Sequence, residues 1–246
     1  MADTPADQSA DQRAGQSADQ RADRTAGARW LGRVGVVLVV AGLALGAYVA
    51  WQVWGTNVVS QRTHRALVED VEQTWRDRAG DGAGASVETD RGDVSAIVRI
   101  PAFGDDYAVP VLEGTSDEVL AAGFGHFSDT AEAGAKGNYA LAAHRITHGE
   151  PLRAMPELQP GDEVVVETRQ WTYTYVLDTG GADLTVPFTA GWVLADVPAN
   201  PDAGGVQPAQ EPGQRLLTLT TCSELFHTDD RLVAFGHLES KEPTTP

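Results

Sequence analysis

The sequence is poor in cysteine and in basic residues. Its 246 residues include one Cys, which excludes an internal disulfide and any cluster of thiolate metal ligands. Lys and Arg number 18 against 35 Asp and Glu, so the net charge is −17. An acidic domain repels the phosphate backbone and gains nothing from counterion release, so we expect no nucleic-acid partner. The lone thiol is either a buried small side chain or a reactive group.

Charge is also absent from a long segment near the N-terminus. Val34–Val53 has no charged residue, and about 20 residues at ~1.5 Å each would cross the ~30 Å hydrocarbon core of a bilayer. Trp residues flank the segment, which is typical of membrane interfaces. A cleaved signal peptide is the alternative, but its apolar region is normally roughly 7–15 residues and a small-residue cleavage site follows it. We therefore predict a retained transmembrane anchor at 34–54.

Positive charge is distributed unequally about this segment. Arg21, Arg24, Arg29 and Arg33 closely precede it, whereas only Arg62 and Arg65 follow it closely. The positive-inside rule then predicts a single-pass protein of the plasma membrane, with its N-terminus in the cytoplasm and everything after Trp54 outside the cell.

The flanking regions differ in composition. Residues 1–33 hold five Asp and five Arg, which cancel, and have few apolar side chains, so we predict a disordered cytoplasmic tail there. The acidic excess therefore lies on the part that should fold. For 55–93 the four-residue spacing of Val, Leu and Trp predicts an extracellular stalk helix, followed by a Gly/Ala linker. We place the folded domain at 94–240 and a short tail at 241–246.

Beyond the linker, short runs rich in β-branched and aromatic residues alternate with Gly, Pro and Asp. Such runs are typical of strands, while Thr115–Gly123 predicts a short capped helix. Several short strands with few helices predict a mainly β domain, folded as a closed or nearly closed barrel. The predicted strands are Val94–Ile100, Tyr139–His144, Asp162–Thr168, Trp171–Thr179, Arg215–Cys222 and Arg231–Leu238.

The lone cysteine, Cys222, ends one of these strands. If that strand pairs with the next one, Arg231 would lie beside Cys222, where a guanidinium lowers a thiol pKa and can neutralise an oxyanion. His144 ends another strand and could act as general acid and base. Each residue also has a simpler explanation. A lone Cys is more often a buried small side chain, His144 is one of six histidines, and the aspartates just before Arg231 could form a local salt bridge.

Three motifs favour the catalytic interpretation of these residues over the simpler ones. They are GNYALAAHR at 137–145, TLTTC at 218–222, and Arg231 nine residues further on in TDDRLVAFGHL. In this order they resemble the sortases, most closely the class E or housekeeping sortases of high-GC Gram-positive bacteria. Similar sequence elsewhere extends the resemblance over most of Val94–Leu238.

This resemblance implies a sortase-type β-barrel and a membrane-anchored cysteine transpeptidase. Cys222 would attack the Thr–Gly bond of a LAXTG or LPXTG sorting signal at the C-terminus of a secreted protein. Arg231 would hold the substrate and stabilise the oxyanion, and His144 would protonate the departing amine. A cell-wall precursor amine, of the lipid II type, would then resolve the thioester. The reaction requires no cofactor and no metal.

Other residues near these motifs are assigned smaller roles. Thr220 and Thr221 could shape the substrate site, and we interpret His148 and His227 as bystanders. Asp183–Pro212 aligns with no family pattern, which leaves substrate preference open. A pilin-polymerising or class D sortase and a non-catalytic anchored domain that binds surface proteins remain as alternatives. Papain-like enzymes have Cys before His, and the Ser-His-Gly-Cys turn of L,D-transpeptidases is not found in this sequence.

Overall fold

The structure is a computed structural model that describes residues 33–49, 51, 56–78, 86–222 and 229–244. The chain divides into two units, Met1–Gln52 and Val53–Pro246. In the first unit, residues 33–49 are helical. Among the described residues, no helix has both the length and the apolar character needed to cross a membrane, so the predicted transmembrane helix is not found there. The predicted tail at 1–33, apart from its last residue, and most of the linker lie outside the described residues.

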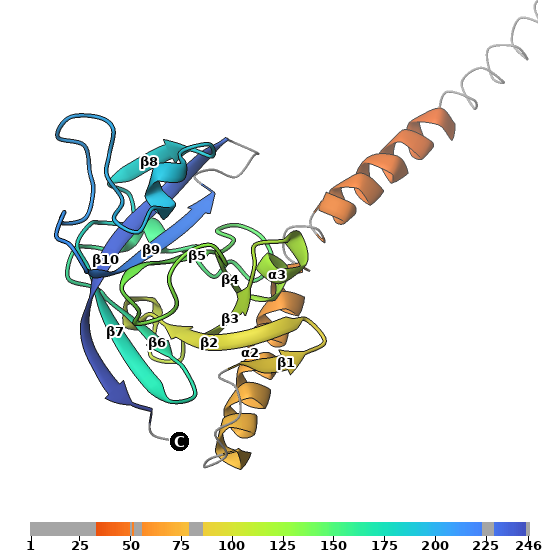
Figure 1. The fold of residues 1–246 in the computed structure, drawn as a ribbon. Coiled ribbons are helices and arrows are strands. Elements are labelled where there is room, and N and C mark those ends of the chain that lie inside the picture. The colour runs from red at the N-terminus through yellow and green to blue at the C-terminus, as the bar shows by residue number, and fades with distance from the viewer. Residues whose placement is uncertain (1–32, 50, 52–55, 79–85, 223–228, 245–246) are drawn as a thin grey trace, which may run out of the picture. The chain divides into compact units, whose positions relative to one another are not determined.

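The second unit contains a sheet that closes on itself (Figure 1). The strands follow the order β2-β3-β4-β5-β9-β10-β7-β6, and β6 pairs again with β2, so these eight described strands form a closed barrel. β1 pairs with β2, and β8 pairs with the start of β10. The strands are β1 Val87–Thr89, β2 Gly92–Arg99, β3 Val109–Glu113, β4 Phe124–His126, β5 Gly137–Ala142, β6 Glu163–Glu167, β7 Trp171–Leu177, β8 Leu184–Pro187, β9 Arg215–Cys222 and β10 Asp230–Pro243.

Alternation of side chains fills the barrel. In β7, Tyr173, Tyr175 and Leu177 are buried and their neighbours are more exposed, which is the period-2 pattern of a strand with one face in a core. The same core receives aliphatic and aromatic side chains from β2, β3, β5, β6 and β9. A mainly β barrel is thus confirmed, and all six predicted strands are present.

Four described strands were not predicted, for identifiable reasons. Pro110 lies inside β3 and Pro187 ends β8, and proline normally counts against a strand because it lacks the N–H that a ladder needs. β1 and β4 have three residues each, too few to show a repeating pattern. β10 also continues to Pro243, into the predicted tail, because Lys241 pairs with Tyr173 across the ladder.

Helices are few in the second unit. α2 covers Thr56–Asp77, and α3 covers Asp117–Ala122, where the side chain of Ser116 accepts a hydrogen bond from the Val119 amide. The helix expected over Thr115–Gly123 is therefore present. Three short 3-10 helices complete the described elements: η2 Pro101–Phe103, η3 Met155–Glu157 and η4 Gly191–Leu194.

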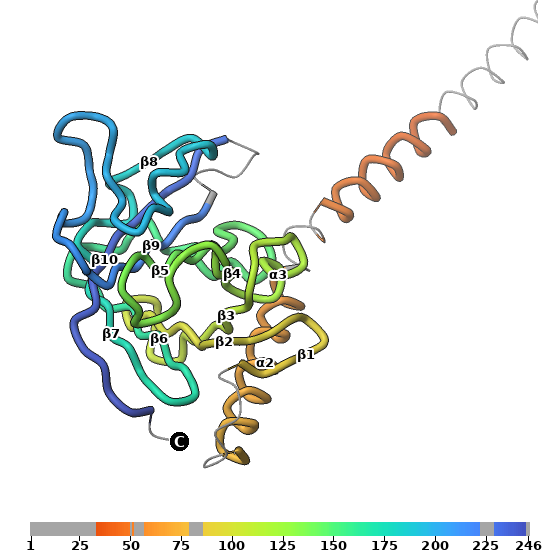
Figure 2. Tube along the Cα trace, in the orientation of Figure 1, coloured from red at the N-terminus to blue at the C-terminus, as the bar shows by residue number. Residues whose placement is uncertain are grey.

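The predicted stalk helix is present as α2, but it packs on the barrel. Figure 2 shows α2 running beside β1 and β2. Leu67, Val71 and Trp75 are buried there in one cluster with side chains of β1, β2 and β3. The four-residue spacing therefore marks a face that is covered by the barrel, and α2 belongs to the same unit as the strands.

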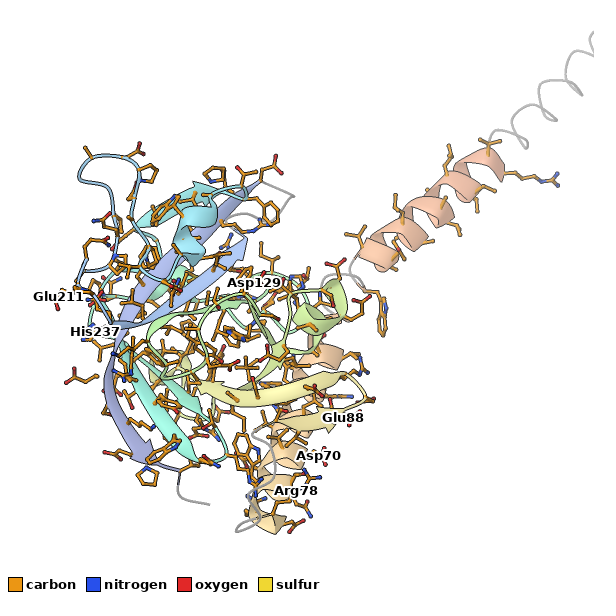
Figure 3. All side chains as sticks on the ribbon, in the orientation of Figure 1. Asp70, Arg78, Glu88, Asp129, Glu211 and His237 are labelled. Atoms are coloured by element: carbon orange, nitrogen blue, oxygen red, sulfur yellow. The ribbon has the colours of Figure 1, made fainter. Side chains whose placement is uncertain are left out.

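The acidic excess lies on the surface of this unit. Acidic side chains from α2, β1 and the loops are exposed, and the labelled ones project outward in Figure 3. The labelled acidic residues are Asp70, Glu88, Asp129 and Glu211. This distribution agrees with the expectation that the excess falls on the folded part.

Candidate active site

Three strands meet at the edge of the barrel where the predicted site residues lie. β5 and β9 are parallel, with Ala142 opposite Thr220, so both strands end at the same edge. β10 runs antiparallel to β9 and begins at this edge, with Arg231 directly opposite Cys222. His144 follows two residues after β5. The expected hairpin is thus present, and the ladder brings the backbones of all three predicted catalytic residues to one place.

A cavity of about 550 Å³ opens at this edge. His144, Thr220, Thr221 and Arg231 all line it. The thiol of Cys222 lies outside the described part of the structure. The cavity is therefore defined by the other side chains that line it. Apolar side chains from three regions form the opposite walls, and they are Leu120 of α3, Phe127, Val186 of β8, Phe188, Val193 and Leu194 of η4. A cavity with an apolar wall and a few polar groups is suited to an extended peptide.

The imidazole of His144 is held from one side. The hydroxyl of Thr147 lies 3.4 Å from its Nδ1. The ring of His148 stacks against it, with 4.7 Å between ring centres. Burial lowers the pKa of His144 to about 4, and the neighbouring His148 and Arg231 act in the same direction, against Asp117. His144 is therefore neutral near pH 7 and able to accept a proton.

Arg231 lies on the other side of the cavity at the start of β10. Its guanidinium is 4.8 Å from the centre of the Phe188 ring, which is 69 % exposed, and its Nη1 donates to the carbonyl of Asp230 at 3.2 Å. Stacking on an aromatic face holds a planar guanidinium in position. No motif in the sequence pointed to Phe188, which lies just after β8 in a region that resembled no family pattern.

The threonines before Cys222 have different roles in the structure. Thr220 forms part of the cavity wall. Thr221 is buried, and its hydroxyl donates to the carbonyl of Ala143 at 2.6 Å. Thr221 therefore joins the end of β9 to the residue before His144. Three residues before Thr221, the hydroxyl of Thr218 donates to the side chain of Asn138 at 2.8 Å. This hydrogen bond is a second link between β9 and β5.

Comparison with known proteins identifies the family. The family model described as Sortase domain matches residues 98–239, which is more than half of the chain. The chain belongs to the sortase family. Members of this family are cysteine transpeptidases, and Cys222, the lone cysteine of this sortase, ends β9 at the edge of the barrel where the cavity opens.

Individual relatives agree with this assignment. Sortase SrtE1 of Streptomyces coelicolor is 31 % identical over 217 residues, covering 85 % of this chain and 57 % of the relative. The chain thus spans little more than half of that protein. SrtE2 of the same organism is 31 % identical over 220 residues, covering 85 % of this chain and 82 % of its own length.

Solved structures show the same fold. Sortase E from Streptomyces avermitilis is 40 % identical with a TM-score of 0.54, covering 63 % of this chain and 93 % of that structure. Sortase E1 from S. coelicolor, solved with a tripeptide in its active site, is 32 % identical with a TM-score of 0.52, covering 64 % of this chain and 94 % of that structure.

One group of side chains elsewhere has the composition of a metal site. Ligand atoms of Glu113, His126 and Glu132 lie within 4.8 Å of one another, and none of these residues lines the cavity. Both ring nitrogens of His126 already have partners: Nδ1 lies 3.0 Å from the Glu113 carboxylate, and Nε2 lies 3.1 Å from the carbonyl of Ala131. The ring is thus committed to hydrogen bonds, and a metal would have to displace one of them. The expectation that no metal is required stays a prediction.

Proposed function

We propose that this sortase cleaves a C-terminal sorting signal of the LAXTG or LPXTG kind between Thr and Gly and transfers the protein to an amine of a cell-wall precursor. The observation that carries the proposal is the convergence of His144 and Arg231 on one cavity, at the point where Arg231 pairs with Cys222 in the ladder. The related sortase E1 has a tripeptide in its active site, which supports a peptide as the ligand of the corresponding cavity here.

The first half-reaction forms a thioester. His144, neutral because its pKa is lowered to about 4, takes the proton of the Cys222 thiol. The thiolate attacks the Thr carbonyl carbon, and Arg231 stabilises the negative oxygen that forms. The C–N bond to Gly then breaks, and the imidazolium of His144 gives its proton to the leaving amine. The lowered pKa makes the imidazolium a stronger acid in this step and the imidazole a weaker base in the first step, where Arg231 assists by lowering the pKa of the thiol.

The second half-reaction regenerates the enzyme. The amine of the wall precursor attacks the thioester carbonyl and loses a proton to His144. The C–S bond breaks, and the sulfur leaves as a thiolate that recovers a proton from His144. One amide bond has replaced another, so the reaction needs neither ATP nor a redox partner.

The site of action follows from where the two substrates meet. Sorting signals and lipid-linked precursors occur together on the outer face of the plasma membrane, so we place the barrel outside the cell with the apolar segment Val34–Val53 as the tether. The described helix at 33–49 exposes a continuous set of Val and Leu side chains, which supports an apolar environment for it. Protease added to intact cells should digest the barrel, and protection of the barrel would contradict this placement.

The reaction is tested with the full chain in detergent. Fluorogenic peptides that carry LAXTG or LPXTG are supplied with an amine acceptor, and the ligated product is measured by mass. We expect transfer by the wild-type protein and none by Cys222→Ala or His144→Ala. His237→Ala, at an exposed histidine of β10 that does not line the cavity, is the control and should remain active. Equal activity in all four proteins would exclude the proposed mechanism.

A further inference from the structure

The segment that follows His144 has an unusual backbone. His148, Gly149 and Glu150 have φ angles of 53°, 83° and 55°, so three successive residues lie in the left-handed region. L side chains rarely adopt this region, because Cβ approaches the carbonyl oxygen. Two of the three residues carry side chains, so local preference does not favour this conformation. The segment must be held in place by contacts with other parts of the molecule.

Asn57, near the start of α2, supplies these contacts. Its Oδ1 accepts a hydrogen bond from the amide of Gly149 at 3.1 Å. Its Nδ2 donates to the carboxylate of Glu150 at 2.7 Å and lies 3.4 Å from the carbonyl of Ile146. Asn57 is only 7 % exposed, so these are partners it cannot replace with water. One side chain therefore binds the left-handed segment at three points.

The rest of the contact between α2 and this segment is close but incomplete. A Cβ on Gly149 would lie 2.7 Å from Cε1 of His64, so the backbone fits directly against the helix. Beside this contact, a cavity of about 300 Å³ separates α2 from residues 149–154. Because packing does not fill that space, the hydrogen bonds of Asn57 have a larger share in holding the segment.

The segment in turn sets the position of His144. Thr147 contacts Nδ1 of His144, and His148 stacks on its ring. The amide of Leu152 donates to the carbonyl of His144 at 3.0 Å, so the loop closes on the residue from which it started. A shift at Gly149 would therefore be transmitted to the imidazole through its two nearest side-chain neighbours.

We propose that Asn57 is a positioning residue for His144, acting through residues 146–150. The inference rests on the proposed role of His144 as general acid and base. It makes α2 a part of the active-site framework, in addition to its packing on the barrel. Asn57 does not line the cavity at the end of β9, so it acts without touching the substrate.

Exchanging donor and acceptor tests the proposal. Asn57→Asp places a carboxylate opposite that of Glu150, which removes the donor and adds repulsion. We expect kcat for peptide transfer to fall by about tenfold or more, with KM changed less than about twofold, because a misplacement of about 1 Å can cost about 100-fold in rate. Glu150→Gln alone should stay within about threefold of wild type, since the new amide oxygen can still accept from Asn57.

The double variant Asn57→Asp/Glu150→Gln provides the decisive measurement. The new carboxylate can accept from the Gly149 amide, as Asn57 does, and from the new side-chain amide, which reverses the second hydrogen bond. Of the three contacts, only the long one to the Ile146 carbonyl is not restored. We expect kcat to recover to within about threefold of wild type. Asn57→Ala, which removes the contacts without adding charge, should lower kcat less than Asn57→Asp does. All variants are made in the full chain, and the melting temperature is measured for each.

The outcomes separate this inference from the proposed function. If His144→Ala is inactive while Asn57→Asp keeps the wild-type kcat, the positioning role is wrong and the catalytic role stands. If the double variant recovers its melting temperature but not its kcat, Asn57 supports the fold alone. If His144→Ala transfers peptide as well as wild type does, both the function and the positioning role that depends on it are wrong.

Discussion

Two regions hold His144, and they do so by different means. On one side, β5, β9 and β10 hold it through a backbone ladder, in which Ala142 pairs with Thr220 and Arg231 pairs with Cys222. On the other side, α2 holds the segment after His144 through side chains, chiefly Asn57. A ladder of backbone hydrogen bonds depends little on which side chains it carries, whereas the second support depends on individual residues.

This difference separates effects on rate from effects on folding. Substitution of a cavity residue on the ladder should change the reaction and leave the barrel intact. Substitution in the face of α2 that packs on the barrel should change stability first. The contacts of α2 with residues 146–150 should affect both quantities, because that segment is supported by the helix and contacts the imidazole. The predictions below test this division, beginning with the largest expected effect.

Arg231 tests the ladder side. Arg231→Ala should lower kcat/KM by about 100-fold to 1,000-fold, because it removes the group that stabilises the oxyanion. Arg231→Lys keeps the charge but loses the planar fork that stacks on Phe188, so its activity should be intermediate. The free energy of unfolding should change by less than about 1 kcal/mol in either variant, since the backbone pair with Cys222 remains. A large loss of stability in a urea titration would contradict the division.

Trp75 tests the helix side. Trp75→Ala removes a large side chain that is 8 % exposed and buried against β1, β2 and β3, and should cost about 3 kcal/mol in urea unfolding. Val59→Ala, at a 55 % exposed position of the same helix, is the matched control and should cost less than about 0.5 kcal/mol. Below the unfolding transition, kcat should stay near the wild-type value. A large fall in kcat with unchanged stability would place Trp75 among the positioning residues.

The same division explains what could be predicted from the sequence. The bounds of β9 were predicted correctly, because a run of Leu and Thr ending at Cys222 has the composition of a strand. The motifs around His144, Cys222 and Arg231 predicted which residues meet, and the ladder brings them together. The role of Asn57 could not be predicted, since it arises from the left-handed backbone at His148 and Glu150. His is enriched at positive φ and Glu is not, so these residue types do not mark a run of three such residues.

For α2, the sequence predicted the element but not its place in the fold. The spacing of Leu67, Val71 and Trp75 defines an apolar face, and an apolar face alone does not name the surface that covers it. Of the four missed strands, β3 and β8 carry a proline, and β1 and β4 have only three residues each, too few for a pattern. Tertiary contacts stabilise these elements more than local preference does.

His64 tests the boundary between α2 and the segment after His144. Burial lowers its pKa to about 4, and His144 and His148 act in the same direction. The folded form thus prefers the neutral ring, so protonation favours unfolding, and stability should be lost as the pH falls from about 6.5 to about 4. At a pH below about 4, protonation of His64 should lower the free energy of unfolding by at most about 3 kcal/mol, since each unit of pKa difference corresponds to about 1.36 kcal/mol. In His64→Gln, the fall in melting temperature between pH 7 and pH 4.5 should be smaller than in wild type, and an equal fall would contradict this.

Thr221 tests whether the two supports are independent. Its buried hydroxyl donates to the carbonyl of Ala143, so this one side chain on the ladder reaches the residue that precedes His144. Thr221→Val keeps the shape but removes the donor, and should cost about 1–2 kcal/mol of stability. Thr221→Ser keeps the donor and should cost less. If the ladder alone fixes the end of β5, kcat should fall by less than about threefold in Thr221→Val, in which the backbone pairing remains. If kcat falls as much in Thr221→Val as in Asn57→Asp, the ladder also positions His144 through a side chain. The two supports would then differ only in how much each depends on individual side chains.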